Sequence, residues 1–377
     1  MINAGFQQPA FAYFYFMNIL LAFDSFKGCM SSDEANAVAS SVLQPYFPND
    51  DIIALPLSDG GEGWLTAYQQ AIGGQLIPVA THDPMMRRVT AHYLRLGDTA
   101  VIEVAQASGL SLLQPEERNP MRATSYGTGE ILAKAMLDGC RKFVIGLGGS
   151  ATSDAGIGMI RALIDVLAPS GRFDDIDMIR QCSFTLGSDV TNPLCGEQGA
   201  AYVFAPQKGA DAAMVRVLDE RACRFAEISA RHFGYDRSHE AGAGAAGGLG
   251  YAFIEYMNAT CESGARLLLR AARWSRLLPA TRFVLTGEGA SDAQTLMGKL
   301  PQIVLSEARG SQPPVPVYLF AGRVADREQL LAAGFADVRA ITPTEQSLDE
   351  AMRKDVARRN LSTAVAQWAQ RFGQTDI

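Results

Sequence analysis

The sequence predicts an α/β fold with two domains. At 377 residues, the chain exceeds what one hydrophobic core usually organises. At both ends of the chain, short apolar runs alternate with longer helical patterns, whereas apolar runs in the middle are joined by tight turns. Because parallel strands need crossover connections, the two ends together predict one doubly wound parallel sheet, into which a mixed-sheet α/β domain is inserted.

The chain opens with a predicted βαβ unit. Run length and flanking turn residues predict a strand at Asn18–Phe23, a helix at Ser31–Gln44 and a strand at Asp51–Leu57. We expect Met17 to be the natural start, which makes residues 1–16 an extension that the fold does not need.

The C-terminal part of the chain repeats this alternation of strand and helix. Its predicted elements are, in order, strand Phe283–Thr286, helix Leu300–Arg309, strand Val315–Ala321, helix Arg327–Ala333, strand Val338–Ile341 and a terminal helix Leu348–Arg371. These strands complete the parallel sheet that the first βαβ unit begins.

The middle of the chain predicts a different sheet. Tight turns indicate antiparallel pairing of its first strands, which are Gln75–Val79, Arg88–Leu96 and Ala100–Val104. Further strands follow at Phe143–Leu147, Phe184–Leu186 and Ala201–Phe204, with helices at Gly129–Leu137 and Met214–His232. We therefore expect a parallel domain of residues 17–80 and 280–377, an inserted domain of residues 81–279, and a ligand cleft between them.

Composition argues against several partners. A net charge of -7 lacks the basic footprint that binding to nucleic acid requires. No Lys or Arg precedes Lys27, so the basic region of a secretory signal is missing, and no apolar stretch is long enough to suggest a membrane span. The six cysteines show no CxxC pair, which favours reduced thiols over a zinc site or disulfides. We expect a cytoplasmic protein that binds neither nucleic acid nor membranes.

Loops that follow the predicted parallel strands carry the candidate chemistry. Ligands of open parallel sheets bind beyond the carboxyl ends of the strands. Residues 24–28 (DSFKG), 58–63 (SDGGEG) and 286–289 (TGEG) combine carboxylates, hydroxyls and glycines, and Asp292 follows the last of them. Successive NH groups in glycine turns form anion sites. Each loop alone could be an ordinary turn, but their convergence favours a ligand site.

Loops of the inserted domain add candidate phosphate contacts. Ser125–Gly129 and Gly148–Asp154 place glycines and hydroxyls at helix starts, where NH groups and the helix dipole favour an anion, although capping explains the same residues. The run 242–250 (GAGAAGGLG) contains a GxGxxG match without a preceding strand, and Walker A is absent. Asp189 could bind magnesium or accept a hydroxyl proton, and Lys208 could neutralise phosphate charge; the alternatives are an Asx turn and a solvated lysine.

In order and spacing, these loops resemble the type 1 glycerate kinase family over residues 17–370. The motifs that carry the resemblance are DSFKG at 24–28, SDGGEG at 58–63, ASGL at 107–110, TSYGTGE at 124–130, LGGSATSD at 147–154, SDVTNPL at 188–194, PQKGA at 206–210, AGAGAAGGLG at 241–250 and TGEGASDAQTLMGK at 286–299. The resemblance implies two α/β domains, one of them flavodoxin-like. It also implies phosphorylation of D-glycerate to 2-phosphoglycerate, with ATP and Mg²⁺. The oligomeric state stays open, with a homodimer as one alternative.

Position, residue type and this resemblance together suggest roles for the candidate residues. The predicted catalytic residues are Asp24, Lys27 and Asp189, and the predicted substrate-binding residues are Ser25, Asp59, Gly60, Gly61 and Glu62. The predicted ATP-binding residues are Gly127, Thr128, Gly148, Gly149, Ser150, Thr152, Lys208, Gly247, Gly248 and Lys299, and the predicted metal ligands are Glu288 and Asp292. A kinase for another small hydroxy acid or sugar acid, and a binding-only member without turnover, are the alternatives.

The chain also departs from the family pattern. Similar proteins usually carry Asn and Gly where this chain has Ser153 and Ala155, and often a cation where it has Ala290. Lys299 or Arg323 would then have to supply that charge. The stretch 163–181 is shorter than the family pattern by roughly two dozen residues.

Overall fold

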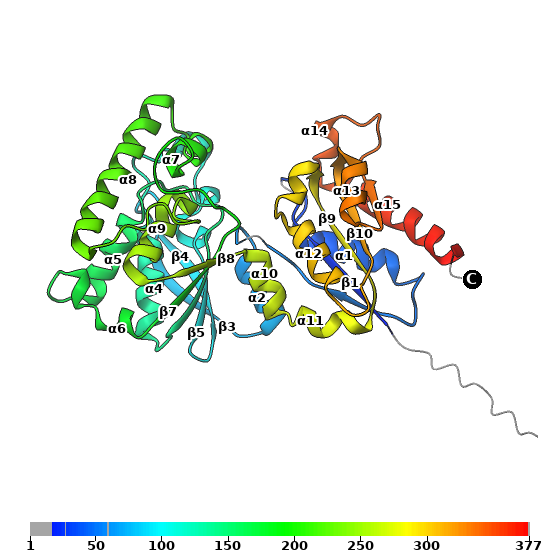
Figure 1. Ribbon diagram of the computed structural model, residues 1–377, viewed down its shortest axis with the longest axis horizontal. Coiled ribbons are helices and arrows are strands. Elements are labelled where there is room, and N and C mark those ends of the chain that lie inside the picture. The colour runs from blue at the N-terminus through cyan, green and yellow to red at the C-terminus, as the bar shows by residue number, and fades with distance from the viewer. Residues whose placement is uncertain (1–16, 27, 59, 376–377) are drawn as a thin grey trace, which may run out of the picture.

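The computed structural model describes residues 17–26, 28–58 and 60–375, folded as two lobes (Figure 1). The expectation about residues 1–16 lies outside this described part of the chain. One lobe contains the start and the end of the described chain, and the other contains its middle, as the colours in Figure 1 show.

The first lobe is built on a parallel sheet. Within the described residues it has five strands in the order β11-β10-β9-β1-β2, and every neighbouring pair is parallel. The strands are β1 (Asn18–Phe23), β2 (Asp51–Ala54), β9 (Thr281–Ser291), β10 (Val317–Val324) and β11 (Asp337–Ala340). Renumbered within this lobe, the order is 2-1-3-4-5, which is the flavodoxin-like arrangement. The predicted sheet from both chain ends is confirmed.

Helices cover both faces of this sheet because its central strands are apolar on both sides. Ile19 and Leu21 of β1 pack in one cluster with α1 (Ser32–Leu43) and α15 (Lys354–Thr375). Leu20 and Ala22 face the opposite way, in a cluster with α12 (Leu300–Arg309) and α13 (Arg327–Ala333). The predicted terminal helix is in fact two helices, because α14 (Leu348–Ala351) ends before α15 begins.

The second lobe is built on a mixed sheet in the order β3-β4-β5-β6-β7-β8. Its strands are β3 (Gln75–His82), β4 (Arg88–Leu96), β5 (Thr99–Glu103), β6 (Lys142–Gly146), β7 (Ser183–Gly187) and β8 (Thr260–Glu262). Pairing is antiparallel from β3 to β5 and parallel from β5 to β8. The predicted mixed sheet is confirmed as well.

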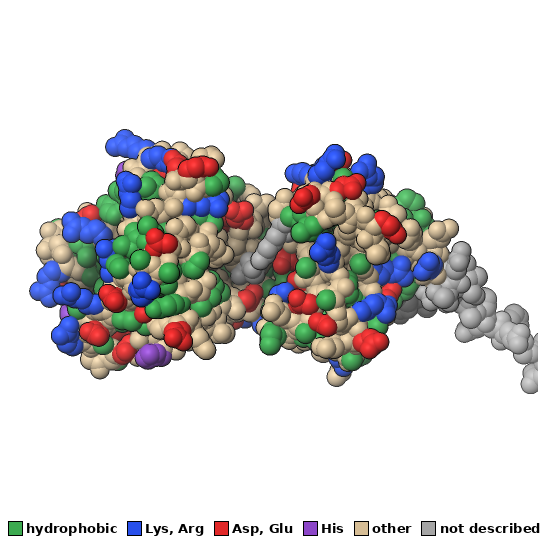
Figure 2. Space-filling view, turned by 90° about the horizontal axis from the view of Figure 1, so that it is seen from above, with side chains coloured by type: hydrophobic (Ala, Val, Ile, Leu, Met, Phe, Trp, Pro, Cys, Tyr) green, Lys and Arg blue, Asp and Glu red, His purple; other side chains and the backbone are tan. Residues whose placement is uncertain are grey.

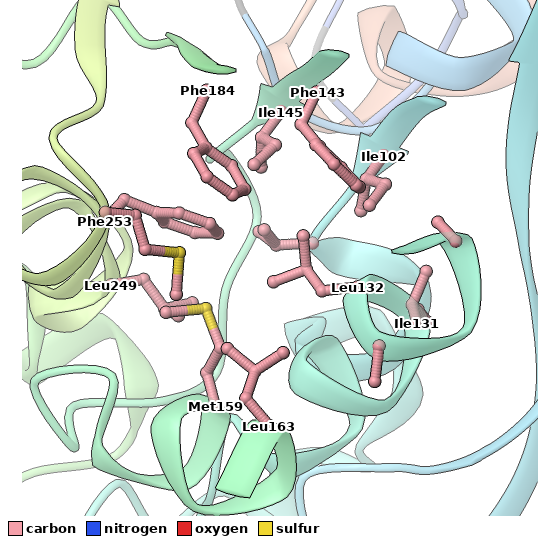
Figure 3. Close-up of a cluster of buried hydrophobic side chains, with 14 of the residues drawn as sticks. Ile102, Ile131, Leu132, Phe143, Ile145, Met159, Leu163, Phe184, Leu249 and Phe253 are labelled. Carbon is pink, nitrogen blue, oxygen red and sulfur yellow. The ribbon is translucent and has the colours of Figure 1, made fainter. Parts of the chain in front are cut away.

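Helices also cover both faces of the mixed sheet. On one face, α4 (Tyr126–Leu137), α5 (Ile157–Leu167) and α9 (Ala245–Met257) form the core that Figure 3 shows, with Leu132, Met159 and Phe253 packed against the strands. On the other face lie α2 (Trp64–Ile72) and α10 (Gly264–Ala271). The long helix α8 (Ala212–Phe233) packs at the outer edge of this lobe (Figure 1).

The predicted strand at Ala201–Phe204 is wrong, because these residues form helix α7 (Ala200–Phe204). A short apolar run cannot be assigned from its periodicity alone, and here Ala200 and Ala201 are buried while Tyr202 and Val203 are exposed, a helical pattern. The chain also enters the second lobe earlier than expected. The boundary between residues 80 and 81 falls within β3, which pairs with β4 along its full length.

The two lobes share one hydrophobic cluster. Val284 and Leu319 of the parallel sheet belong to the same buried cluster as Leu94 and Val101 of the mixed sheet, with Trp64 of α2 among them. Seen from above, the lobes meet at a narrower waist, and acidic and basic side chains are intermixed over both (Figure 2). Among the described residues, no helix is both long enough and apolar enough to cross a membrane.

Candidate active site

A cavity of about 490 Å³ lies at the carboxyl ends of the parallel strands. Asp24 and Ser25 line it directly after β1, Glu288 lines it from the end of β9, and Asp189 reaches it from the inserted lobe, after β7. In the strand order, β1 and β9 lie side by side where the chain switches direction across the sheet, the place where open α/β sheets bind ligands. The structure therefore brings together three loops that the sequence singled out separately.

The same cavity has cationic side chains on its wall. Lys299 and Arg323 line it beside Ala290. Ala290 and Arg323 are direct partners in the pairing of β9 with β10, so their side chains stand on the same face of the sheet. Thr342 after β11 and Asn360 of α15 also line the cavity, and sequence reasoning missed both. The strand-end rule could have found Thr342, whereas Asn360 is brought there only by packing of the terminal helix.

A second cavity of about 720 Å³ adjoins the first and shares Asp24 and Ser25 with it. Its wall combines Gly61 and Glu62, which follow β2, with Gly148 and Gly149, which follow β6. Both lobes thus contribute a glycine loop to this cavity. Lys27 and Asp59, which belong to the same two motifs, lie outside the described residues.

The two glycine loops touch backbone to backbone. The NH of Gly148 donates to the carbonyl of Gly60 at 2.8 Å. Gly60 has a φ of 101°, and a Cβ there would overlap the carbonyl oxygen of Gly187 at the end of β7. A glycine is required at residue 60 for both reasons, because a side chain is disfavoured at this φ and has no room. This contact fixes the SDGGEG loop against the inserted lobe.

Glu288 and Asp292 converge on one cation. The Nζ of Lys299 lies 3.9 Å from a carboxylate oxygen of each. Glu288 is buried, and its Oε1 accepts hydrogen bonds from Ser291 Oγ at 2.8 Å and Thr295 Oγ1 at 2.7 Å. Asp292 caps the turn that follows, accepting from the NH of Gln294. In the described structure, the two predicted metal ligands are thus bonded to this loop and to Lys299.

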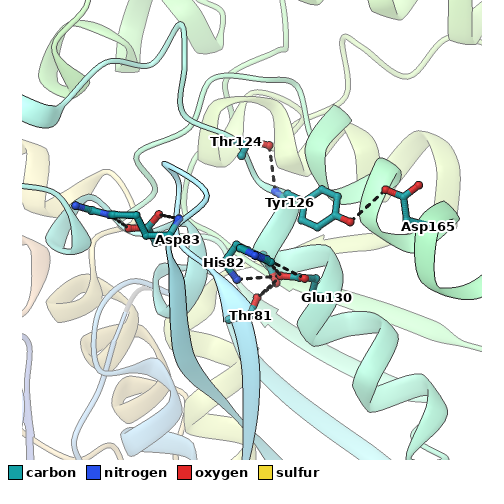
Figure 4. Close-up of polar contacts among 9 residues, drawn as sticks. Thr81, His82, Asp83, Thr124, Tyr126, Glu130 and Asp165 are labelled. Atoms are coloured by element: carbon teal, nitrogen blue, oxygen red, sulfur yellow. Dashed lines mark hydrogen bonds and ion pairs between the residues drawn. The ribbon is translucent and has the colours of Figure 1, made fainter.

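The TSYGTGE motif at residues 124–130, which contains the predicted phosphate loop Ser125–Gly129, packs against strand β3 (Figure 4). The Glu130 carboxylate accepts from Thr81 Oγ1 at 2.8 Å and from the NH of His82 at 2.9 Å. A Cβ at Gly127 would overlap the His82 carbonyl oxygen. Thr128 is buried, with Oγ1 2.7 Å from Ser108 Oγ. These contacts attach α4 to the sheet, and neither Gly127 nor Thr128 is among the residues that line the two cavities.

Lys208 is a buried cation in the inserted lobe. Its Nζ donates to Ser150 Oγ at 2.9 Å and to the carbonyl of Thr152 at 2.7 Å. Burial lowers the pKa of Lys208 from its ordinary value of 10.5 to about 7, and the negative charge of Asp154 only partly opposes this. Through these two hydrogen bonds, Lys208 stabilises the loop that begins at Gly148.

The glycine run at residues 242–250 closes over the same loop. Gly247 and Gly248 have φ values of 67° and 90°, and a Cβ on Gly247 would overlap the Thr152 carbonyl oxygen. The NH of Ala155 donates to the carbonyl of Gly247 at 3.0 Å. No strand leads into this run, so it is not a dinucleotide fingerprint. In this structure its glycines allow close backbone packing.

These features define a class of protein. An open parallel sheet that presents carboxylates and cations to a cleft, faced by glycine loops of an inserted domain, is typical of an enzyme acting on small charged substrates. The model of the glycerate kinase family matches residues 19–373. The chain belongs to the glycerate kinase family, a family of kinases.

Individual relatives are similar to this chain over most of their length. The glycerate kinase of Halalkalibacterium halodurans is 37% identical over 376 residues, covering 93% of this chain and 98% of its own. The glycerate 2-kinase of Escherichia coli K12 is 34% identical over 358 residues, covering 89% and 93%. A solved structure of a candidate glycerate kinase 2 from Salmonella typhimurium LT2 has a TM-score of 0.78 and 34% identity, covering 96% of this chain and 99% of its own.

Proposed function

We propose that this enzyme transfers the γ-phosphoryl group of ATP to D-glycerate, giving 2-phosphoglycerate and ADP in the cytoplasm. One observation carries the proposal: Asp24, Asp189 and Glu288 share a single cavity with Lys299 and Arg323, in a member of this family. Phosphoryl transfer mainly requires that a protein position the reactants and neutralise charge, and the carboxylates and cations that line this cavity can do both. The similarity to a glycerate 2-kinase supports the 2-phosphate as the product.

The acceptor site is proposed at the end of β1. Glycerate carries a carboxylate, so we assign its recognition to Ser25 together with Arg323 and Lys27, the last by its place in the DSFKG motif alone. Asp24 or Asp189 would accept the proton of the reacting hydroxyl. Both line the first cavity, and Asp24 also lines the second, where we place the phosphates.

The ATP phosphates are proposed to lie along the second cavity. The Gly148 NH already donates to Gly60, so the NH groups that follow it, beginning with Gly149, would receive a phosphate oxygen. Gly61 and Glu62 face the same space from the other lobe. Lys208 would act indirectly here, by holding Ser150 and Thr152.

The carboxylates of the cleft fit magnesium. Mg²⁺ at kinase sites is usually held by one or two carboxylates, by waters and by the phosphates themselves, so Asp24 and Asp189, which line the same cavity, would suffice. When bound, the ion would neutralise charge on the transferred group. Glu288 and Asp292, the metal ligands expected from the sequence, would contribute through Lys299, which lies at 3.9 Å from each.

Phosphorus NMR of the product from ATP and D-glycerate tests the proposal. We expect ADP and one new phosphomonoester resonance coupled to the proton on carbon 2. A panel of other hydroxy acids and sugar acids in a coupled ADP assay tests the substrate. If another acid is phosphorylated faster than glycerate, that acid would replace glycerate as the proposed substrate. If ATP binds but no ADP is released in the presence of glycerate, the protein would be a binding-only member of the family.

Arg323 is predicted to supply the charge that Ala290 lacks. We expect Arg323→Ala to raise the KM for glycerate about 10- to 100-fold, the loss typical of a hydrogen bond between charged groups. Arg276→Ala, which removes an exposed arginine of helix α11 (Trp274–Leu277), serves as the matched control. The double variant with Ala290→Arg should recover part of the loss, because residues 290 and 323 are paired across the two strands. Unchanged kinetics in Arg323→Ala would remove Arg323 from the site.

A further inference from the structure

We propose that Cys195, Asp219 and Cys223 form a binding site for a thiophilic divalent cation such as Zn²⁺. In the described part of the chain, two sulfur atoms and a carboxylate oxygen of these residues all lie within 4.8 Å of one another. None of the three lines the cleft cavities. The site is therefore separate from the proposed magnesium site.

The ligands come from a helix and a loop. Asp219 and Cys223 are spaced i, i+4 on α8, so they lie on one face of that helix, and Cys223 Sγ is 3.9 Å from Asp219 Oδ2. Cys195 comes from the segment that follows β7. In a tetrahedral site with bonds of about 2.0–2.3 Å, ligand atoms lie about 3.3–3.8 Å apart, so small side-chain rotations suffice to close this group on an ion.

The backbone already holds the loop in place for this ligand set. The NH of Gly196 donates to Asp219 Oδ1 at 2.9 Å, which ties the residue after Cys195 to α8. The NH of Leu194, the residue before it, donates to the Ser238 carbonyl at 2.8 Å. All three ligand residues are only partly buried, so an ion can reach them from solvent.

The electrostatic surroundings favour a cation. Cys195 and Cys223 interact with each other, and the other charged groups that act on them are carboxylates: Asp219 and Asp236 on Cys195, and Asp219 and Glu227 on Cys223. Two thiolates with one carboxylate form a soft ligand set, which suits Zn²⁺ and not Mg²⁺. Each thiol releases its proton to solvent when it binds the ion, and a water would fill the fourth position.

Binding would tie α8 to the segment that carries Asp189. That segment runs from the cleft to Cys195, and its Asn192 carbonyl accepts from the NH of Gly244 at 2.9 Å. An ion at Cys195 would fix the far end of this segment without touching the cleft. We therefore expect it to raise the melting temperature of the whole protein.

The experiment uses the full-length, reduced protein with Zn²⁺ and Co²⁺ as probes. We expect saturable binding of one Zn²⁺ per chain by titration calorimetry, a higher melting temperature, and thiolate-to-cobalt charge-transfer absorption with Co²⁺. Cys195→Ser, Cys223→Ser and the isosteric Asp219→Asn should each weaken Zn²⁺ binding by more than ~10-fold, the lower end of what loss of even an outer-shell partner costs. Cys182→Ser, a partly buried cysteine elsewhere, should bind as the wild type does.

Several outcomes would overturn the site. Absence of saturable binding, equal binding in the Cys182 and Cys223 variants, or a Co²⁺ spectrum without thiolate bands would each exclude it. The same holds if Cys195 and Cys223 form a disulfide in air while the reduced protein, with both thiols free, does not bind Zn²⁺. Circular dichroism of each variant separates loss of the ion from loss of the fold.

Discussion

Ala155 adopts a left-handed backbone conformation, with a φ of 52°, which residues other than glycine rarely adopt. It is buried in the loop that the glycine run covers, so neighbouring backbone holds it there. We expect Ala155→Gly to raise the free energy of unfolding by about 0.5–1 kcal/mol, because glycine reaches this conformation without steric cost. Urea denaturation measures the change. Ala151→Gly, a buried alanine without a positive φ, should destabilise, and a loss of stability in both variants would contradict this account.

Lys208 gives the protein a pH dependence that can be assigned to one residue. Its pKa is lowered from 10.5 to about 7 by burial, so between these values residue 208 binds more protons in the unfolded chain, and its contribution to stability rises with pH across this window. Below pH 7 the cost of the buried charge is present in full. We expect Lys208→Met to lack this rise when the free energy of unfolding is measured at pH 7 and pH 10.

The control for this prediction is Lys142→Met, which removes an exposed lysine paired with Asp98 at 3.2 Å. Its pH profile should run parallel to that of the wild type. A profile of Lys208→Met that also runs parallel to the wild type would show that the buried ammonium is not the source of the dependence.

Residues that line the cleft were easier to predict from the sequence than glycines that pack against the protein backbone. Asp24 and Ser25 follow β1 and Glu288 lies near the carboxyl end of β9, and the ends of neighbouring parallel strands necessarily meet at one edge of the sheet. Gly127 and Gly247 have the same local pattern as a phosphate loop. Their contacts here are with protein backbone, and a glycine that approaches a carbonyl looks the same in sequence as one that approaches a phosphate.

Helix α2 begins without a side-chain cap of its own, because Gly63 stands at its N-cap position. The Oε2 atom of Glu103, at the end of β5, accepts from the NH of Leu65 at 3.0 Å instead. Burial raises the pKa of Glu103 from 4.5 to about 6, although these backbone hydrogen bonds oppose the shift. One strand thus caps a helix that begins beside the glycine loop of the second cavity.

The burial of Glu103 predicts a second pH effect, of opposite sign. The stability that neutral Glu103 gives is full below pH 4.5 and is lost as pH rises through 6, a change of about 2 kcal/mol. Glu103→Gln should remove this loss, so the difference in unfolding free energy between variant and wild type grows from pH 4.5 to pH 7. Glu116→Gln, an exposed glutamate, is the control. A constant difference would contradict a neutral Glu103 in the folded protein.

At the scale of elements, long periodic segments were predictable and glycine-rich ones were not. Strand β1 and helix α1 match the prediction within about two residues. Helix α9 was missed because it opens with glycines and an alanine in left-handed conformations at residues 246–248, which no helical pattern contains. The cluster of Cys195 with Cys223 was also invisible, since only tertiary packing brings a loop against α8.

The two lobes meet at Gly60, and this contact is predicted to set the geometry of the whole cleft. Gly60→Ala would push the SDGGEG loop away from the Gly187 carbonyl, and a displacement of about 1 Å can lower kcat/KM about 100-fold. Gly97→Ala is the matched control, because Gly97 also has a positive φ but has open space around it. Equal effects of both variants on kcat/KM would show that the backbone angle matters and the contact between lobes does not.

The parallel sheet joins the two ends of the chain, and this has a consequence for synthesis on the ribosome. Thr286 Oγ1 donates to the Ala22 carbonyl at 2.7 Å across 264 residues. At about 5–20 residues per second, β1 leaves the ribosome roughly 10–50 s before its partner β9. The mixed-sheet lobe is continuous in sequence and can fold during that interval. Strand β1, apolar on both faces, meanwhile has an unpaired edge, which makes the nascent chain prone to aggregation until β9 is made.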